Sequence, residues 1–215
     1  MSIQVLIIGL GQFGMSLAKT LSKKGAEVIA TDINKELVDE AANYIDDAIC
    51  LDATDEISIS KLCPKERDVV ICAIGAREPS ILATALLKQL GCENIIARAT
   101  DKMHERILKA VGAKNVINPD EEYGKKFAYK IMFQNVISYE SSDDIQLLEI
   151  NVQPFMIGKT LIELMLPNKY GIIVAAIKKG SALIRPFADK KLDVNDKLLL
   201  VCTEEAIIKM IEENK

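Results

Sequence analysis

Ile3-Gln4-Val5-Leu6-Ile7-Ile8-Gly9-Leu10-Gly11-Gln12-Phe13-Gly14 is the stretch that decides the fold of this chain of 215 residues. A short run that is apolar almost throughout is typical of a strand buried on both faces of a parallel sheet. The spacing G-x-G-x-x-G follows this run, and a helical pattern comes directly after it. The order of strand, glycine turn and helix is the fingerprint of a dinucleotide-binding site.

Each glycine of this turn has its own role in the fingerprint. Gly9 allows the tight turn, Gly11 lets the backbone approach a pyrophosphate, and Gly14 lets the helix pack closely on the strand. An anion there meets free backbone N–H groups at the positive end of the helix. We therefore predict that Gly9, Gly11, Gln12, Phe13 and Gly14 bind a nucleotide cofactor.

An acidic residue at the end of the second apolar run supports this prediction. The run 28–31 ends in Asp32, which lies 23 positions beyond Gly9. The ribose-binding carboxylate of the fingerprint is expected roughly 20 residues after the turn. We count Asp32 and the adjacent Ile33 among the cofactor-binding residues. Ile33 and Asn34 offer no positive charge to a 2′-phosphate, so we expect NAD(H), ATP or ADP rather than NADP(H). A Rossmann-like turn that has lost its ligand remains the alternative.

Strand and helix patterns alternate six times in the first 119 residues. This alternation predicts an α/β fold, a doubly wound parallel sheet with helices on both faces. Ligands of such sheets bind beyond the carboxyl ends of the strands. Those ends add to the candidate site Asp52, Ala53, Thr54, Ile74, Gly75 and Arg98. Singly these residues have plain explanations as turn, cap or surface residues, but together they favour a binding site.

Composition excludes several classes of protein. A net charge of −4 and a pI near 5.3 argue against a non-specific nucleic-acid binder. The longest apolar run, 69–76, is too short to span a membrane. The first strand begins almost at Met1 and leaves no room for a signal peptide, so we expect a cytoplasmic protein. Five cysteines without a C-x-x-C pair are interpreted as core residues, with a redox role for Cys63 or Cys92 as the alternative.

A second, smaller α+β domain is predicted after the parallel sheet. A helical pattern runs from Glu121 to about Ile137, and it either packs on the core or crosses over to dock a partner subunit. The composition then changes to the polar stretch 138–144. We predict a Rossmann nucleotide-binding domain at 1–137, a linker at 138–144 and the small domain at 145–215.

Catalytic residues are not recognisable beside the predicted cleft. His104 is the single histidine, and we interpret it as an exposed or helix-capping residue. None of the five tyrosines is followed by lysine four residues later, and neither a Walker lysine nor G-x-S-x-G is found. A nucleotide cleft without acid–base groups indicates binding rather than turnover. A small NAD-dependent oxidoreductase and a Rossmann-type redox sensor remain alternatives.

Taken together, the motifs resemble one known family. Similarity to the N-terminal domain of the Trk/Ktr potassium-transport regulators is found in six places: the glycine turn, Asp32, Asp52-Ala53-Thr54, Ala73-Ile74-Gly75, Ile96-Ala97-Arg98-Ala99 and Val116-Ile117-Asn118-Pro119. Ile157-Gly158-Lys159-Thr160-Leu161 and Val194-Asn195-Asp196-Lys197-Leu198 resemble their small C-terminal domain. The resemblance implies a cytosolic, non-enzymatic subunit, in a homo-oligomeric ring built of dimers, that gates a membrane potassium transporter or channel.

The resemblance also implies particular roles. It places Asp32 on the ribose, Asp52 and Thr54 on the adenine side, Arg98 near the phosphates, and Asp120 where some members bind a cation. Cyclic di-AMP binds the C-terminal domain in some members. This chain departs from the family in having Gln12 where arginine is frequent, for which Arg77 is a candidate substitute. Its segment 166–169 also departs from the pattern expected of a cyclic di-AMP site.

Overall fold

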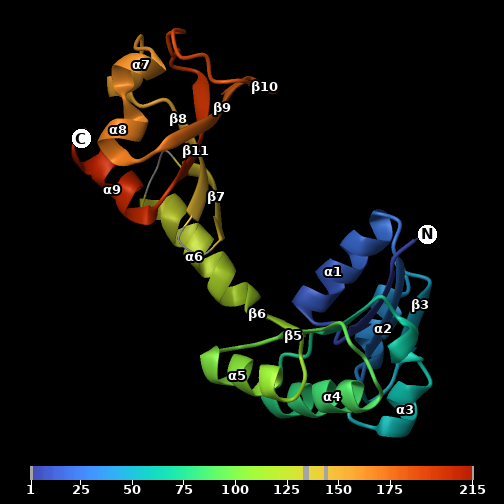
Figure 1. The fold of residues 1–215 in the computed structure, drawn as a ribbon. Coiled ribbons are helices and arrows are strands. Elements are labelled where there is room, and N and C mark those ends of the chain that lie inside the picture. Colours follow the sequence, from blue (N-terminus) through green and yellow to red (C-terminus); the bar gives the residue numbers. More distant parts are fainter. Residues whose placement is uncertain (1, 133–135, 143–144, 215) are drawn as a thin grey trace. The chain divides into compact units, whose positions relative to one another are not determined.

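The computed structural model describes residues 2–132, 136–142 and 145–214, and for residues 129, 130, 132 and 136–142 it describes the backbone alone (Figure 1). Two compact units divide the chain, Met1–Glu121 and Glu122–Lys215. Each unit has its own hydrophobic core and is described by itself. None of the described helices is long and apolar enough to cross a membrane.

A six-stranded parallel sheet forms the centre of the first unit and confirms the predicted α/β fold. Its strands are β1 (Gln4–Ile8), β2 (Glu27–Asp32), β3 (Asp47–Cys50), β4 (Val69–Cys72), β5 (Ile95–Arg98) and β6 (Asn115–Ile117). Their order is β3-β2-β1-β4-β5-β6. The chain therefore winds outward from β1 in both directions, which leaves a crevice at the carboxyl ends of β1 and β4.

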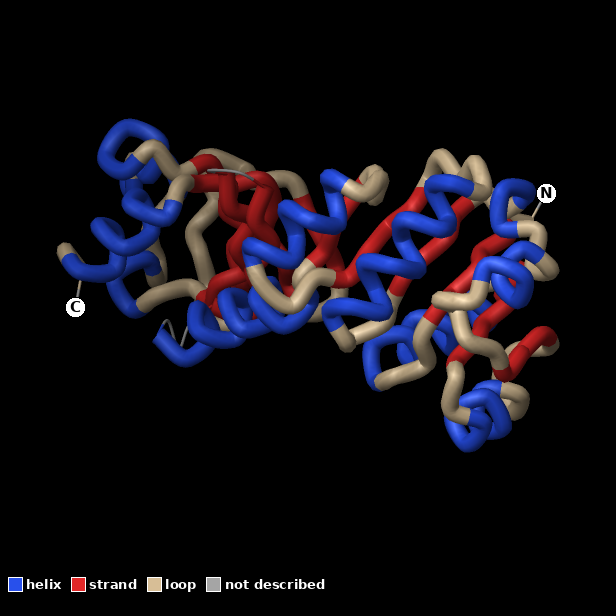
Figure 2. The backbone as a smooth tube through the Cα atoms, turned by 90° about the horizontal axis from the view of Figure 1, so that it is seen from below, coloured by secondary structure: helices blue, strands red, loops and turns tan. Residues whose placement is uncertain are grey.

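Helices cover both faces of this sheet, as the alternating strands and helices of Figure 2 show. The first-unit helices are α1 (Gln12–Lys23), α2 (Lys35–Ala41), α3 (Glu56–Ser60), α4 (Arg77–Gln89) and α5 (Lys102–Ala110), with a 3₁₀ turn at Pro64–Glu66. On one face, α1 and α2 pack against Val5 and Ile7 of β1. On the other face, α3, α4 and α5 pack against Leu6 and Ile8. Successive side chains of a strand point to opposite faces, so a buried parallel strand is apolar at every position.

The second unit is built on a five-stranded antiparallel sheet of order β10-β9-β11-β8-β7. Its strands are β7 (Val136–Ser142), β8 (Ile145–Asn151), β9 (Ile173–Lys179), β10 (Ala182–Ile184) and β11 (Asp196–Cys202). The helices are α7 (Leu161–Leu164), α8 (Leu166–Tyr170) and α9 (Glu204–Glu212), with a 3₁₀ turn at Pro154–Met156. Leu198 and Leu200 of β11 alternate into a core shared with Ile207 and Met210 of α9.

The segment around the predicted linker differs from the sequence prediction. Helix α6 (Pro119–Met132) ends before Ile137, and residues 138–142 belong to β7, which pairs antiparallel with β8. A polar segment suits β7 because this strand lies at the edge of its sheet, where only one side of the backbone is paired with a strand. The division between compact units falls within α6, at Glu121/Glu122, rather than at 138–144. Residues 133–135 and 143–144, which the predicted helix and linker include, lie outside the described part of the chain.

Candidate functional site

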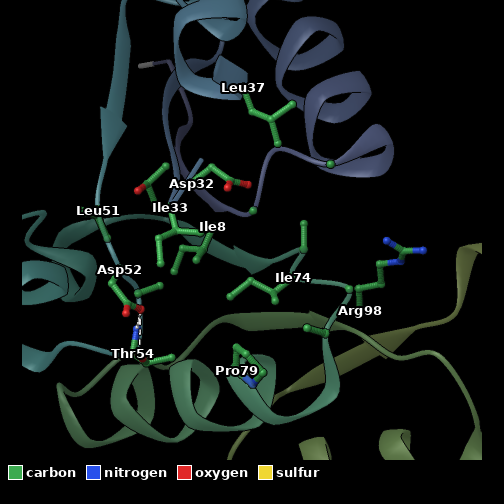
Figure 3. Close-up of a pocket in the computed structure, with 17 residues that line it drawn as sticks. Ile8, Asp32, Ile33, Leu37, Leu51, Asp52, Thr54, Ile74, Pro79 and Arg98 are labelled. Atoms are coloured by element: carbon green, nitrogen blue, oxygen red, sulfur yellow. Dashed lines mark hydrogen bonds between the residues drawn. The ribbon is translucent and has the colours of Figure 1, made fainter. Parts of the chain in front are cut away.

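A cavity of about 470 Å³ lies at the carboxyl edge of the parallel sheet, where the winding direction reverses (Figure 3). Ten of the predicted site residues line it: Gly9, Gly11, Asp32, Ile33, Asp52, Ala53, Thr54, Ile74, Gly75 and Arg98. They come from turns that are distant in sequence, and the parallel register of the strands brings them to one edge. The size suits a small-molecule ligand.

The glycine turn has the geometry that its sequence predicts. Gly9 has φ +100°, and a Cβ built on it would lie 2.9 Å from the backbone nitrogen of Ile74. A Cβ on Gly14 would lie 1.9 Å from the carbonyl oxygen of Gly9. A Cβ on Gly11, by contrast, would meet no atom within 4 Å. Two glycines are therefore required by packing, whereas Gly11 borders open space in the cavity.

The N-terminus of α1 lies beside this space, because its N-cap residue, Gly11, lines the cavity. Gly11 provides no side chain to cap the backbone donors of the helix, and the first turn of α1 carries no acidic residue. The first N–H groups of a helix lack partners within the helix, and its dipole places partial positive charge there. An anionic group such as a pyrophosphate fits this position because it supplies the missing acceptors.

Asp32 connects the glycine turn to the end of β2. Its Oδ2 accepts a hydrogen bond of 2.6 Å from the backbone N–H of Leu10, and its Oδ1 accepts one of 2.8 Å from Asn34. A carboxylate offers about four acceptor sites, so both oxygens retain capacity for ribose hydroxyls. The role of Asp32 is thus double, because it holds the turn in place as well as facing the cavity.

Asp52 and Thr54 form the wall beyond β3. Oδ1 of Asp52 accepts from both the backbone N–H of Thr54 at 2.9 Å and its hydroxyl at 2.7 Å. In Figure 3 this pair lies across the cavity from Arg98, with Ile8 and Ile74 between them. The cavity therefore has acidic groups on one side, a cation on the other and an apolar floor.

Arg98 lies at the end of β5 and is held from two directions. Its guanidinium donates to Oδ2 of Asp120 at 2.8 Å, and its Cζ lies 6.0 Å from the ring centre of Phe13. Within the described residues its buried Nε has no hydrogen-bond partner.

Three predicted cofactor residues support the cavity without lining it. Gln12 is exposed at the start of α1, Phe13 is half-buried against the core, and Gly14 lies buried beneath the Gly9 carbonyl. Arg77 pairs with Asp101 and also stands outside the set of lining residues. This geometry therefore does not support Arg77 as a substitute for the arginine that the family often has in place of Gln12. Asp120 pairs with Arg98, and no cluster of three potential metal ligands occurs among the described residues.

Sequence reasoning missed most of the apolar floor. The additional lining residues are Ile8, Thr31, Leu37, Leu51, Ala73, Ala76 and Pro79. Each of Ile8, Thr31 and Leu51 directly precedes a predicted turn residue in the sequence. This neighbouring position is the feature from which they could be predicted as lining residues. A flat apolar floor between polar walls suits a base or another planar ring.

The interpretation of His104 as an exposed or capping residue is wrong. Its side chain is buried between α4 and α5, with Nε2 2.8 Å from Oγ of Ser80, and the N-cap of α5 is Asp101. The prediction that all five cysteines are core residues is wrong for Cys50 and Cys63, which are exposed. Cys72, Cys92 and Cys202 are buried, and burial raises the pKa of each thiol, that of Cys202 to about 11. A raised pKa keeps the thiol protonated and unreactive.

Two domain families match the chain in succession. The TrkA-N domain matches residues 5–119, and the TrkA-C domain matches residues 147–214. The Ktr system potassium uptake protein C of Bacillus subtilis (strain 168) is 37% identical over 198 residues, which are 91% of this chain and 90% of that protein. The Ktr system potassium uptake protein A of Vibrio alginolyticus is 32% identical over 207 residues, covering 95% of this chain and 94% of that protein.

A solved channel structure has the same fold. The GsuK channel bound to NAD matches with a TM-score of 0.66 at 17% identity. The match covers 96% of this chain and 38% of that chain, so this chain corresponds to less than half of the channel's length.

Proposed function

This chain belongs to the family of Trk and Ktr potassium-uptake proteins with a TrkA-N and a TrkA-C domain, and we infer that it is the regulatory subunit of a membrane potassium transporter or channel. The observation that carries this inference is the order of the two domain matches, together with an alignment that covers 91% of this chain and 90% of the Bacillus subtilis relative. The chain supplies no helix of its own, among the described residues, that could form an ion path.

NAD(H), ATP or ADP is the ligand we propose for the cavity. The pyrophosphate contacts the N-terminus of α1 beside Gly11, and the ribose hydroxyls donate to Asp32. The adenine ring lies over the apolar floor towards Asp52 and Thr54. The open space beside Gly11 and the uncapped start of α1 support this placement.

Two further ligand sites remain predictions. A cation at Asp120 has to compete with the ion pair to Arg98, and ligands from a second subunit are needed to complete the site. Cyclic di-AMP at the C-terminal domain would have to bind beside the start of α8. There Leu166 is buried in the core of the second unit and is followed by Pro167. Calorimetry with each ligand tests these two sites separately.

The assembly we propose is a cytosolic homo-oligomeric ring of dimers attached to the membrane through the potassium-conducting subunit. Tyr123, Phe127 and Ile131 of α6 support it, because they recur every four residues and are all exposed. Residues at this spacing lie on one face of a helix. An exposed apolar helix face of this kind is a surface for another subunit.

Regulation without catalysis is the mechanism that the proposed cleft allows. The described lining residues include two carboxylates and one arginine but no histidine, lysine, cysteine or tyrosine to pair with them as acid, base or nucleophile. Nucleotides that prefer different conformations of the ring shift its equilibrium, and typical coupling energies are about 1–3 kcal/mol.

Co-expression with a potassium-conducting membrane subunit of the same organism tests the proposed role. We expect the two chains to purify together and the membrane protein alone to lose nucleotide dependence. Absence of a complex contradicts the role of regulatory subunit. Steady oxidation of NADH with common carbonyl substrates would instead favour an oxidoreductase.

A further inference from the structure

His104 joins the two helices that flank the far side of the cleft. It lies in the first turn of α5 and is completely buried. Its Nε2 is 2.8 Å from Oγ of Ser80 in α4, and its Nδ1 is 3.3 Å from the backbone nitrogen of Thr100. The ring thus bridges α4 to the segment between β5 and α5.

The hydrogen-bond partners determine the protonation of this ring. A backbone N–H can only donate, so Nδ1 accepts from Thr100 and carries no proton. Nε2 therefore carries the proton and donates it to Oγ of Ser80. The Ser80 hydroxyl in turn donates to the carbonyl oxygen of Arg77 at 2.8 Å. A directed chain of hydrogen bonds runs from Thr100 through the neutral imidazole to the first turn of α4.

This chain of hydrogen bonds ends in a turn that also contains residues lining the cleft. Ala76, the N-cap of α4, and Pro79 both line the cavity, and Ser80 follows directly in the same turn. The backbone N–H of Ser80 also donates to the carbonyl of Ala76 at 3.1 Å. The position of this wall of the cleft therefore depends on the bond between Ser80 and His104.

We propose that His104 is a positioning residue for the nucleotide cleft, and that protonation of its ring weakens nucleotide binding because the ring parts from Thr100 and shifts Ser80, its hydrogen-bond partner in the first turn of α4. The inference rests on the nucleotide binding proposed above. An imidazolium presents N–H groups at both ring nitrogens, so its new proton at Nδ1 faces the N–H of Thr100. The two N–H groups then oppose each other, the Thr100 hydroxyl 3.3 Å from Nδ1 is left as the acceptor for the new proton, and the ring becomes a buried cation.

The charges around the ring also oppose its protonation. Burial, followed by the positive charge of Arg77 in α4, lowers the pKa of His104, while the carboxylate of Asp101 acts in the opposite direction. From the neighbouring strands come Cys72 of β4, whose thiol contacts the Ser80 carbonyl, and Arg98 of β5, which pairs with Asp120. Strand β6 carries no titratable side chain.

The pH window follows from the direction of this shift. Because the folded-state pKa is lowered, the unfolded chain takes up the proton first as the pH falls below about 6.5. The neutral network is therefore fully formed above about pH 6.5 and is lost as the pH falls through the lowered pKa of the folded protein. Nucleotide binding should weaken over the same window.

The NMR titration of His104 in the full chain, with and without NAD⁺, tests the proposal. The chain has one histidine, so its imidazole signals need no assignment. Linkage is reciprocal, so a ligand that requires the neutral ring must lower the His104 pKa when it binds. We expect a fall of at least about half a unit at saturating NAD⁺, and about threefold weaker NAD⁺ binding at the acid end of the window.

Two variants separate positioning from simple structural support. In His104→Gln the amide can accept from Thr100 and donate to Ser80 but does not titrate, so we expect binding close to that of the original chain with the pH dependence removed. Ser80→Ala retains the titrating ring without its link to α4, so the effect of NAD⁺ on the His104 pKa should disappear. If either variant fails to fold, the titration of the original chain decides alone.

The outcomes distinguish this proposal from the function on which it depends. An unchanged His104 pKa at saturating NAD⁺ overturns the positioning role and leaves nucleotide binding intact. Retention of the full pH dependence in His104→Gln overturns it equally. If neither NAD⁺ nor ADP binds at neutral pH, the proposed nucleotide site is wrong and the positioning role is wrong with it.

Discussion

At the scale of single residues, substitutions at two glycines of the same turn should affect ligand binding and folding separately. In Gly11→Ala the new methyl group points into open space, so the expected cost is that of a poorer N-cap, under about 1 kcal/mol. In Gly14→Ala the methyl group collides with the Gly9 carbonyl, and overpacking of this kind costs about 2 kcal/mol or more.

Chemical denaturation and calorimetry on the two variants check this first prediction. We expect Gly11→Ala to fold normally and bind nucleotide at least tenfold more weakly, because its methyl group occupies space next to the pyrophosphate. Gly14→Ala should be clearly destabilised. Unchanged affinity in a well-folded Gly11→Ala protein would place the ligand elsewhere.

Asp32 gives a second prediction at the same scale. Its carboxylate should attract ribose hydroxyls and repel a 2′-phosphate, while exposed Ile33 and Asn34 supply no compensating charge. We expect NADP(H) to bind at least tenfold more weakly than NAD(H), a difference of about 1.4 kcal/mol. Equal affinities for NADH and NADPH by calorimetry would contradict this role.

These single residues also show which features of the site can be predicted from the sequence. The turn geometry at Gly9 and Gly14 and the position of Asp32 beside the cavity followed from spacing, because the backbone of the turn depends on local sequence. The burial of His104 did not, because its partners Ser80 and Thr100 belong to another helix and to a turn. No local pattern reports which helices pack against each other.

At the scale of elements, the buried core of each unit, within the part of the chain whose side chains are described, comes from that unit's own residues. The two core clusters of the first unit include no buried residue beyond Ala113, and the core of the second unit begins at Leu148. A unit that buries its own apolar residues can fold alone. The alternation of strands and helices predicted these elements well, since buried parallel strands differ clearly from amphipathic helices.

The element that sequence reasoning misplaced was β7. Its polar residues were interpreted as a linker because an edge strand needs neither a fully apolar run nor a buried face on both sides. Pairing with β8, which lies just after it in the chain, determines its structure. Such pairing is a tertiary property that composition does not record.

A fragment of residues 1–121 provides the prediction for this scale. Because all lining residues of the cleft lie between Ile8 and Arg98, the fragment should unfold cooperatively and bind NAD⁺ within about threefold of the full chain. Thermal unfolding and calorimetry measure both properties. A fragment that folds but does not bind would show that the second unit or another subunit completes the site.

At the scale of the whole molecule, the exposed face of α6 and the cleft together imply an assembly that responds to its ligand. We expect a homo-oligomer with an even number of subunits whose small-angle scattering differs between the ADP and ATP forms, with no consumption of nucleotide. Phe127→Glu places a charge on the exposed face and should dissociate the assembly without unfolding the subunit. Identical scattering from the apo, ADP and ATP forms at saturating ligand would leave the assembly without a nucleotide response.

Potassium flux through the membrane partner tests the central claim most directly. The partner is reconstituted in lipid vesicles with this chain, and flux is measured without nucleotide and with saturating NADH, ADP or ATP. The account predicts that flux changes at least several-fold between nucleotides and that Gly11→Ala, which retains its fold, removes the difference. The same flux in every nucleotide state, or a nucleotide response that persists in Gly11→Ala, would contradict it.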